Sequence, residues 1–289
     1  MNAVVKMMVT FPALLCAAGA WAGSPINESR PLRADGRVSV DNLAGEIEVR
    51  GWDQDRVVIT GELGEDVEEL EISGDADSLR ILVRYPRRSS GIEETLLQLR
   101  VPVGASLQLE GVSADLRVDG VSGPLQGNTV SGDIEVDVRS PEVSLQSVSG
   151  DIRLRAPAAS VKLQSVSGDV RAEGVQGDVS GETVSGDVDI KGGAFRALAT
   201  QTVSGDLNLQ GALAAGGSLR AESMSGDIDV LLAEPPDALL TMKSFSGVIS
   251  SEFGPREAGG RRKIEKTLGS GKGRIDLNSF SGDIRLAKR

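Results

Sequence analysis

The chain has 289 residues, a formal net charge of −11, one cysteine and no histidine. This composition excludes a Ser-His-Asp triad and the usual zinc and iron–sulfur sites, so any bound metal would need oxygen ligands. Its acidity argues against nucleic acid and anionic membrane surfaces as partners.

Residues 1–22 predict a secretory signal peptide. An apolar run, MMVTFPALLCAAGAWA (7–22), ends in AWA, with small residues at the −3 and −1 positions of a cleavage site. The run is short for a membrane span, and cleavage after Ala22 leaves no integral span in the mature chain. An acylated Cys16 is the alternative, although Leu15 precedes it where a lipobox has Gly, Ala or Ser. We therefore expect export to the periplasm or cell surface of a bacterium.

Residues 23–110 have strand-like runs without a strict period. The stretch VSVDNLAGEIEVRGWDQDRVVITGEL (38–63) contains NLAGEIEV, a loose copy of a motif that returns later in the chain. Further strand-like runs end in Pro or Gly. We predict that this segment is a β-rich cap that covers one end of a repeat array. Trp52 is then expected to be a residue of the cap rather than a platform for a ligand.

Residues 111–289 are built from a repeated motif. The copies are VSADLRV (112–118), VSGDIEV (130–136), VSGDIRL (148–154), VSGDVRA (166–172), VSGDVDI (184–190), VSGDLNL (203–209), MSGDIDV (224–230), FSGVIS (245–250) and FSGDIRL (280–286). Their spacing is about 18 residues at first and longer toward the end. A half-period is visible midway between copies, so each repeat should hold two strands.

Alternation within the motif predicts an all-β fold. In VSGDIRL, one parity holds Val148, Gly150, Ile152 and Leu154, which we expect to point inward, and the other parity is polar. One unit cannot bury such a face alone, but stacked units can. The favoured fold is a parallel β-solenoid of about 18 residues per repeat, which forms one continuous domain with the cap over 23–289. Antiparallel stacking of hairpins is the main alternative.

The Ser-Gly-Asp tripeptide is interpreted as scaffold. The glycine falls on the inward parity, where the chain bends tightly or a neighbouring backbone approaches closely. Serine and aspartate beside it are turn formers that can bond local backbone groups.

Parallel stacking would place the repeated aspartates in a row. Neighbours would lie roughly 4.8 Å apart, and two such charges repel by about 0.9 kcal/mol in water. Arg153 and Arg171 could neutralise the middle of the row. Ca²⁺ binding is the alternative, although the motif matches known Ca²⁺-binding repeats poorly and no cofactor is expected. The candidate ligands are Asp133, Asp151, Asp169, Asp187, Asp206 and Asp227.

The segment 252–274 is glycine-rich and basic. We interpret it as a solvated loop or hairpin inserted into the last turn, with docking of an anionic partner as the functional alternative. FSGDIRLAKR would then close the array as one more unit. The cations concerned are Arg256, Arg261, Arg262, Lys263, Lys266, Lys272 and Arg274.

These features together resemble the bacterial putative-adhesin family of β-strand-repeat proteins, a domain of unknown function. The resemblance rests on NLAGEIEVRGWD, the serial VSGDI units and the closing GRIDLNSFSGDIRL, and it covers residues 34 to 287. It implies a β-helix-like, non-catalytic, extracytoplasmic protein and supplies no site residues. An interaction scaffold for an envelope protein or polysaccharide is the leading hypothesis. A Ca²⁺-binding structural module and a carboxylate-dependent polysaccharide-active enzyme are the alternatives.

Overall fold

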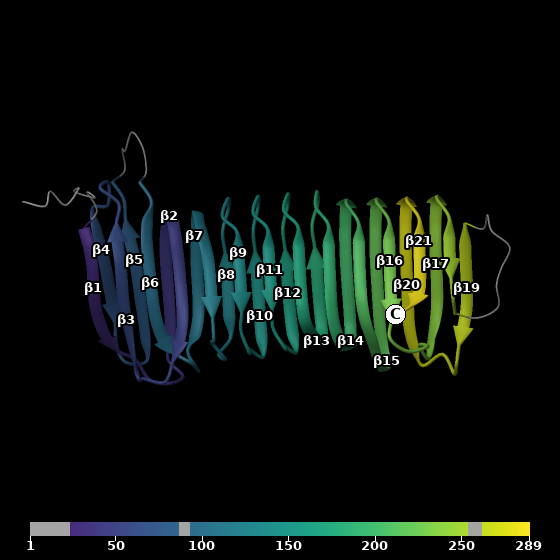
Figure 1. The fold of residues 1–289 in the computed structure, drawn as a ribbon, viewed down its shortest axis with the longest axis horizontal. Helices are drawn as coiled ribbons and strands as arrows, with labels where there is room; N and C mark the ends of the chain where they lie inside the picture. The colour runs from purple at the N-terminus through teal and green to yellow at the C-terminus, as the bar shows by residue number, and fades with distance from the viewer. Residues whose placement is uncertain (1–23, 87–92, 254–261) are drawn as a thin grey trace, which may run out of the picture.

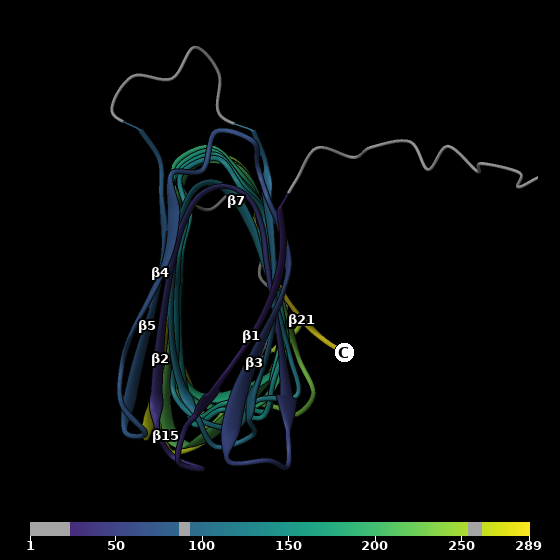
Figure 2. The same cartoon turned by 90° about the vertical axis from the view of Figure 1, so that its left-hand side faces the viewer.

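The computed structural model describes residues 24–86, 93–253 and 262–289, and every regular element in this part of the chain is a β-strand. The all-β prediction is therefore confirmed. The strands stack into a long, flattened coil with two walls (Figures 1 and 2). Within the described residues we find no helix with the length and apolar character needed to cross a membrane. The predicted signal peptide lies outside the described residues.

The middle of the molecule is a regular series of coils. Its strands are β7 (Ser106–Asp119), β8 (Leu125–Asn128), β9 (Ile134–Asp137), β10 (Glu142–Gln146), β11 (Ile152–Arg155), β12 (Ser160–Gln164), β13 (Val170–Glu182), β14 (Val188–Ser204), β15 (Leu207–Ser225) and β16 (Ile228–Leu232). Equivalent residues of successive repeats pair in parallel: Val143 lies beside Val161, and Ile152 lies beside Val170. Parallel pairing of the repeats, predicted from their constant spacing, is confirmed. Stacking identical apolar residues in this way forms one continuous core.

The alternation of buried and exposed side chains shifts at each narrow edge of the coil. Ser147 points inward, Val148 and Ser149 both point outward, and Gly150 is again buried. The predicted inward position of Val148 is therefore wrong: its side chain is 43% exposed. Two successive outward residues turn the chain from one wall to the other. The predicted inward positions of Gly150, Ile152 and Leu154 are confirmed.

The N-terminal end contains strands that do not follow chain order. These strands are β1 (Ser24–Pro31), β2 (Arg37–Trp52), β3 (Arg56–Leu63), β4 (Glu69–Gly74), β5 (Ser78–Arg84) and β6 (Thr95–Pro102). β2 lies between β7 on one side and β5 and β6 on the other, and all these pairs are parallel. The outermost strands are antiparallel to their neighbours: β4 pairs with β5, and β3 pairs with β6 and β1. This end thus extends the two walls of the stack, and each wall ends in an antiparallel strand pair.

The C-terminal end has the same kind of rearrangement. Its strands are β17 (Ala238–Ser246), β18 (Ile249–Ser251), β19 (Lys263–Leu268), β20 (Gly273–Ser281) and β21 (Ile284–Lys288). β20 lies between β15 and β17, and β21 lies between β16 and β18. The last unit of the sequence, β20 and β21, is therefore not the last coil in space, contrary to expectation. It lies between the coil of β15 and β16 and the coil of β17 and β18. Part of the predicted basic loop forms β19, which pairs antiparallel with β17 and is the final strand of its wall.

Candidate interaction surface

A row of exposed apolar side chains runs along one narrow edge of the stack. Each is the residue before Ser-Gly-Asp or its equivalent, and each side chain is 39–59% exposed. In spatial order this apolar ladder consists of Val112, Val130, Val148, Val166, Val184, Val203, Met224, Phe280 and Phe245. Single exposed apolar residues are ordinary on protein surfaces, whereas a contiguous row marks an interaction site.

A row of polar side chains borders the apolar ladder. Four valines of the ladder, from Val148 to Val203, and the polar row line a groove of about 530 Å³. Its polar wall consists of Asn128, Gln146, Gln164, Glu182 and Gln201. Gln146 donates a hydrogen bond to Gln164 at 3.1 Å, and Gln164 donates one to Glu182 at 2.8 Å. These bonds hold the polar side chains in a line parallel to the long axis, so the groove is a straight, repeating surface.

The C-terminal end of the apolar ladder is aromatic. The rings of Phe245 and Phe280 stack with centroids 4.8 Å apart and an interplanar angle of 6°. The Arg262 guanidinium lies 5.4 Å from the centre of the Phe245 ring, within the range of a cation–π contact. Aromatic residues, methionine and arginine are the types enriched at the centres of protein interfaces, and all three meet here beside Met224.

Buried hydroxyl groups support the edge from inside. Three residues before each glycine stands a Ser or Thr, at most 7% exposed: Thr129, Ser147, Ser165, Thr183, Thr202, Ser223, Ser279 and Ser244. Ser165, for example, donates to the carbonyl oxygen of Gly150 at 3.3 Å and accepts from the amide of Gly168 at 3.0 Å. This hydroxyl ladder satisfies backbone groups at a bend that the strand hydrogen bonds do not reach. Sequence reasoning missed it, although the hydroxyl before every apolar residue was a usable signal.

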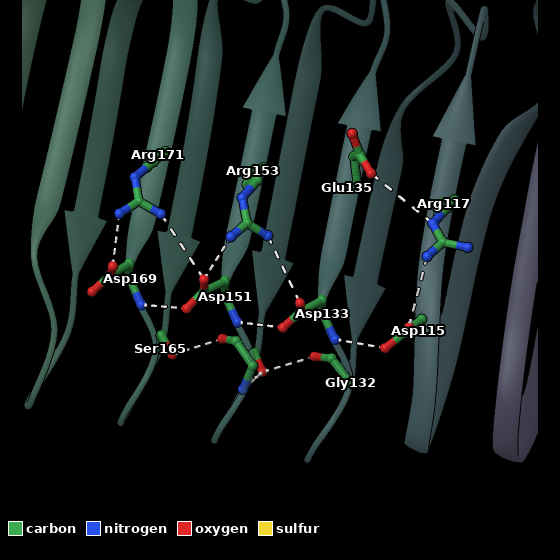
Figure 3. Close-up of polar contacts among 12 residues, drawn as sticks. Asp115, Arg117, Gly132, Asp133, Glu135, Asp151, Arg153, Ser165, Asp169 and Arg171 are labelled. Carbon is green, nitrogen blue, oxygen red and sulfur yellow. Dashed lines mark hydrogen bonds and ion pairs between the residues drawn. The ribbon is translucent and has the colours of Figure 1, made fainter.

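The aspartates of the motif form a ladder of backbone hydrogen bonds (Figure 3). The amide of Asp151 donates to Oδ1 of Asp133 at 2.9 Å, and the amide of Asp169 donates to Oδ1 of Asp151 at 3.0 Å. The same bond recurs from Asp115 to the last coil, at 2.7–3.0 Å. Each carboxylate thus connects two coils.

Arginines neutralise the middle of this aspartate ladder, as predicted. The Arg153 guanidinium lies 2.7 Å from the Asp151 carboxylate and 3.7 Å from that of Asp133. Arg171 lies 2.8 Å from Asp169 and 3.9 Å from Asp151. Among the described residues, no group of three or more His, Cys, Asp or Glu side chains is arranged to hold a metal ion. Ca²⁺ binding by Asp133, Asp151, Asp169, Asp187, Asp206 and Asp227 stays the untested alternative to this scaffold role.

The glycines of the motif sit where neighbouring coils touch. A Cβ added at Gly150 would lie 1.8 Å from the carbonyl oxygen of Gly132, and one at Gly168 would lie 2.1 Å from that of Gly150. The sequence-based prediction of a close backbone approach is confirmed.

The cations of segment 252–274 gather at the C-terminal end. Arg256 and Arg261 lie outside the described residues. Lys263 and Lys266 lie on β19, with Lys263 2.7 Å from Glu265, which lowers the pKa of that carboxyl group. Lys272 directly precedes β20, and Arg274 lies at the start of that strand, where it pairs with Asp276.

Trp52 lies near the N-terminal end at the close of β2. Its indole Nε1 donates to the carbonyl oxygen of Arg56 at 2.9 Å, and the Arg56 guanidinium lies 5.3 Å from the ring centre. The ring thus fixes the turn between β2 and β3, in line with a structural role in the cap.

The fold and its surface ladders define a β-solenoid-like repeat protein without α-helices in its described part. The chain belongs to the Toastrack DUF4097 family, whose model matches residues 47–287. The resemblance drawn from the motifs is thereby confirmed.

Two solved structures are similar at low identity. One is a "putative cell adhesion protein" from Clostridium sporogenes ATCC 15579, with 10% identity, 92% of this chain and 100% of that chain covered, and a TM-score of 0.24. The other is a "putative adhesin" from Parabacteroides distasonis ATCC 8503, with 11% identity, 93% and 98% coverage, and a TM-score of 0.31. A comparison with curated proteins finds no match.

Proposed function

We propose that this protein is an exported, non-catalytic interaction protein of the cell envelope that binds a protein partner along the apolar ladder. The main support for this proposal is the apolar ladder. Nine apolar side chains lie in one row over consecutive coils, roughly 4.8 Å apart, and remain 39–59% exposed. The predicted signal peptide supports a location in the periplasm or at the cell surface.

A protein partner fits this surface better than a polysaccharide. The middle of the ladder offers only valines, and sugar rings are usually bound on aromatic faces. At its C-terminal end, Met224, Phe280, Phe245 and Arg262 form the kind of cluster that dominates binding energy between proteins. The polar row supplies side-chain donors and acceptors at its margin, as in an interface with an apolar centre and a polar rim.

The surface carboxylates support a binding role over a catalytic one. Glycoside cleavage needs a carboxylic acid with a raised pKa beside a second carboxylate. Among described carboxyl groups, every pKa that clearly departs from its ordinary value is lowered, as at Asp178, where Arg196 donates to the carboxylate. The aspartates of the ladder all accept the same backbone hydrogen bond from the next coil, and this repetition favours a scaffold over a single catalytic pair.

Photo-crosslinking in living cells tests the proposal. A benzophenone amino acid at Val166 or Phe280 should yield one discrete crosslinked protein band. The matched control places it at Asp137 or Arg155, the exposed last residues of β9 and β11, which do not line the groove and where no such band is expected. The same partner, purified, should lose at least tenfold in affinity for a Phe245→Ser/Phe280→Ser variant.

Two outcomes would contradict the proposal. Equal crosslinking at the ladder positions and at the control positions would contradict binding along the apolar ladder. Binding of a purified glycan that depends on Val166 and Phe280, with no protein crosslink, would identify a polysaccharide partner instead. Protease treatment of intact and permeabilised cells carrying a C-terminal tag would separate the cell surface from the periplasm.

A further inference from the structure

The two ends of the stack carry opposite charge. The stretch around β4 at the N-terminal end contains six acids and no base over residues 62–71: Glu62, Glu65, Asp66, Glu68, Glu69 and Glu71. The stretch around β19 at the C-terminal end contains five cations and one acid over residues 262–274: Arg262, Lys263, Lys266, Lys272, Arg274 and Glu265. These two segments lie at opposite ends of the long axis (Figure 1).

Both segments contain the terminal strand of the same wall. Consecutive pairings lead from β4 through β5, β2, β7 and the middle coils to β15, β20, β17 and β19. Within the described residues, β4 pairs only with β5, and β19 pairs only with β17. Among the described residues, the outer edge of each strand thus has no neighbouring strand, and such an edge is a template for pairing with another chain.

The directions of the two end strands are compatible with continued stacking. Each is antiparallel to a neighbour that runs parallel with the rest of the wall. β4 and β19 therefore run in the same direction, and each has six residues. Placing the N-terminal end of one copy on the C-terminal end of another would join them as a parallel pair.

The N-terminal end also leaves part of the core incompletely covered. A hollow of about 400 Å³ lies between β1 and β4, with Ile26, Leu63, Leu70 and Ile72 among its lining residues. The last three are only half-buried. Glu28, Glu69 and Glu71 also line the hollow, together with Arg30, so half-buried apolar residues lie among mostly acidic side chains at this end.

The C-terminal end contains cations that face one another. Lys243 on β17 lies directly across from Lys263 on β19, and both side chains are exposed. Like charges directly opposite one another in a sheet are destabilising. Glu265 offsets part of this charge, and a neighbouring acidic strand would offset more.

We propose that copies of this protein associate head to tail, with β4 of one copy beside β19 of the next. Such a contact joins two different surfaces and propagates into a filament rather than closing as a symmetric dimer. Repulsion between like charges disfavours contact between two N-terminal ends or between two C-terminal ends. This proposal does not depend on the proposed function, because the apolar ladder lies on a narrow edge between the walls.

Sedimentation velocity of the exported chain tests the proposal directly. Raising the salt concentration from about 10 mM to about 1 M shortens the Debye length from about 30 Å to about 3 Å. We expect a concentration-dependent series of oligomers at low salt and an association constant at least tenfold lower at high salt.

Charge-reversal variants identify the surfaces. Glu68→Lys/Glu69→Lys at one end, or Lys263→Glu/Lys272→Glu at the other, should each give monomers. Combining all four changes in one chain should restore assembly, because the ends are again complementary. Mixing the two double variants should also restore assembly, with the two variants alternating along the filament, because each end of one is complementary to the opposite end of the other. The control Glu110→Lys/Glu142→Lys makes the same change in net charge as Glu68→Lys/Glu69→Lys, but away from the ends, and should leave assembly intact.

Crosslinking locates the contact. A carbodiimide, which joins carboxylates to amines, should link peptides from residues 62–71 to peptides from residues 263–272 at low salt. Monomers at every salt and protein concentration would overturn the proposal. Oligomers that persist in both end variants but disappear in Val166→Glu would also overturn it, since contact would then run through the apolar ladder.

Discussion

The middle coils and the two ends follow different rules. Between β8 and β12, spatial order equals chain order, and equivalent residues 18 positions apart pair in parallel. At both ends, strands insert out of order and the outermost strands pair antiparallel. The repeat therefore determines the cross-section of the stack, whereas the ends determine where it stops.

The spatial order explains the least regular copy of the motif. In FSGVIS, Val248 stands where other copies have aspartate. Each of those aspartates accepts a hydrogen bond from the amide of the next coil, and Val248 lies in the last coil, where its own amide donates to Asp283 at 2.7 Å. Within the described residues no further coil follows, so an aspartate there would have no amide to accept from. The substitution marks the end of the aspartate ladder.

Shortening a buried leucine should give the largest difference in stability between the middle coils and the ends. Leu145 in the middle is fully buried, and Leu145→Ala should lower the free energy of unfolding by about 4 kcal/mol, because the neighbouring coils cannot collapse into the cavity. Leu70→Ala in the half-buried end strand should cost only about 1 kcal/mol. Urea unfolding followed by circular dichroism measures both, and equal losses would contradict the distinction.

Close backbone contact gives the next largest difference. Gly150→Ala places a methyl group 1.8 Å from a fixed carbonyl oxygen and should cost about 3 kcal/mol. Gly193→Ala is the matched control, since its Cβ would meet only the side chain of Gln176 at 3.7 Å or more. We expect a change within about 0.5 kcal/mol for the control. A mild effect at Gly150 would show that the coils can separate locally.

The sequence predicted the middle better than the ends. Constant spacing required Ile152 and Val170 to share a register, and the structure pairs them. Strict alternation then failed at Val148, because the hydroxyl of Ser147 turns inward to bond the backbone at the edge. At the ends, FSGDIRL is compatible with any position in the stack. Its position between two coils depends on the segment β17–β19, which precedes it in the chain but lies beyond it in the stack. No local sequence pattern encodes that order.

The candidate surfaces were only partly predictable for the same reason. The aspartate row and the partners of Arg153 follow from parity and spacing alone. The apolar ladder does not, because its valines occupy the parity that elsewhere forms the core. The stacking of Phe245 on Phe280 joins residues of two copies whose order is inverted in space.

Removing one rung of the aspartate ladder should have a smaller effect. Asp151→Ala leaves the amide of Asp169 without its acceptor and removes a partner of Arg153, so we expect a loss of about 1–2 kcal/mol. Asp151→Asn keeps an acceptor oxygen and should lose less. Asp137→Ala removes only an exposed pair with Arg155 and should cost at most about 0.5 kcal/mol. The scaffold role predicts the lowest denaturant midpoint for Asp151→Ala, a higher one for Asp151→Asn and the highest for Asp137→Ala. Equal midpoints would contradict it.

The smallest effect is expected at a turn of the C-terminal end. Asp237 accepts hydrogen bonds from the Ser270 hydroxyl and from the amides of Ser270 and Gly271, and these bonds lower the pKa of its carboxyl group below the ordinary value of 3.8. A depressed pKa contributes stability that is present above the ordinary value and is lost as the pH falls through the lowered one. The turn should therefore stay intact on acidification to about pH 4 and loosen only below it. Amide chemical shifts of Ser270 and Gly271 would follow this transition, which Asp237→Asn should abolish. A midpoint at or above 3.8 would show that these bonds do not favour the charged form, and this end of the stack would then rest on strand pairing alone.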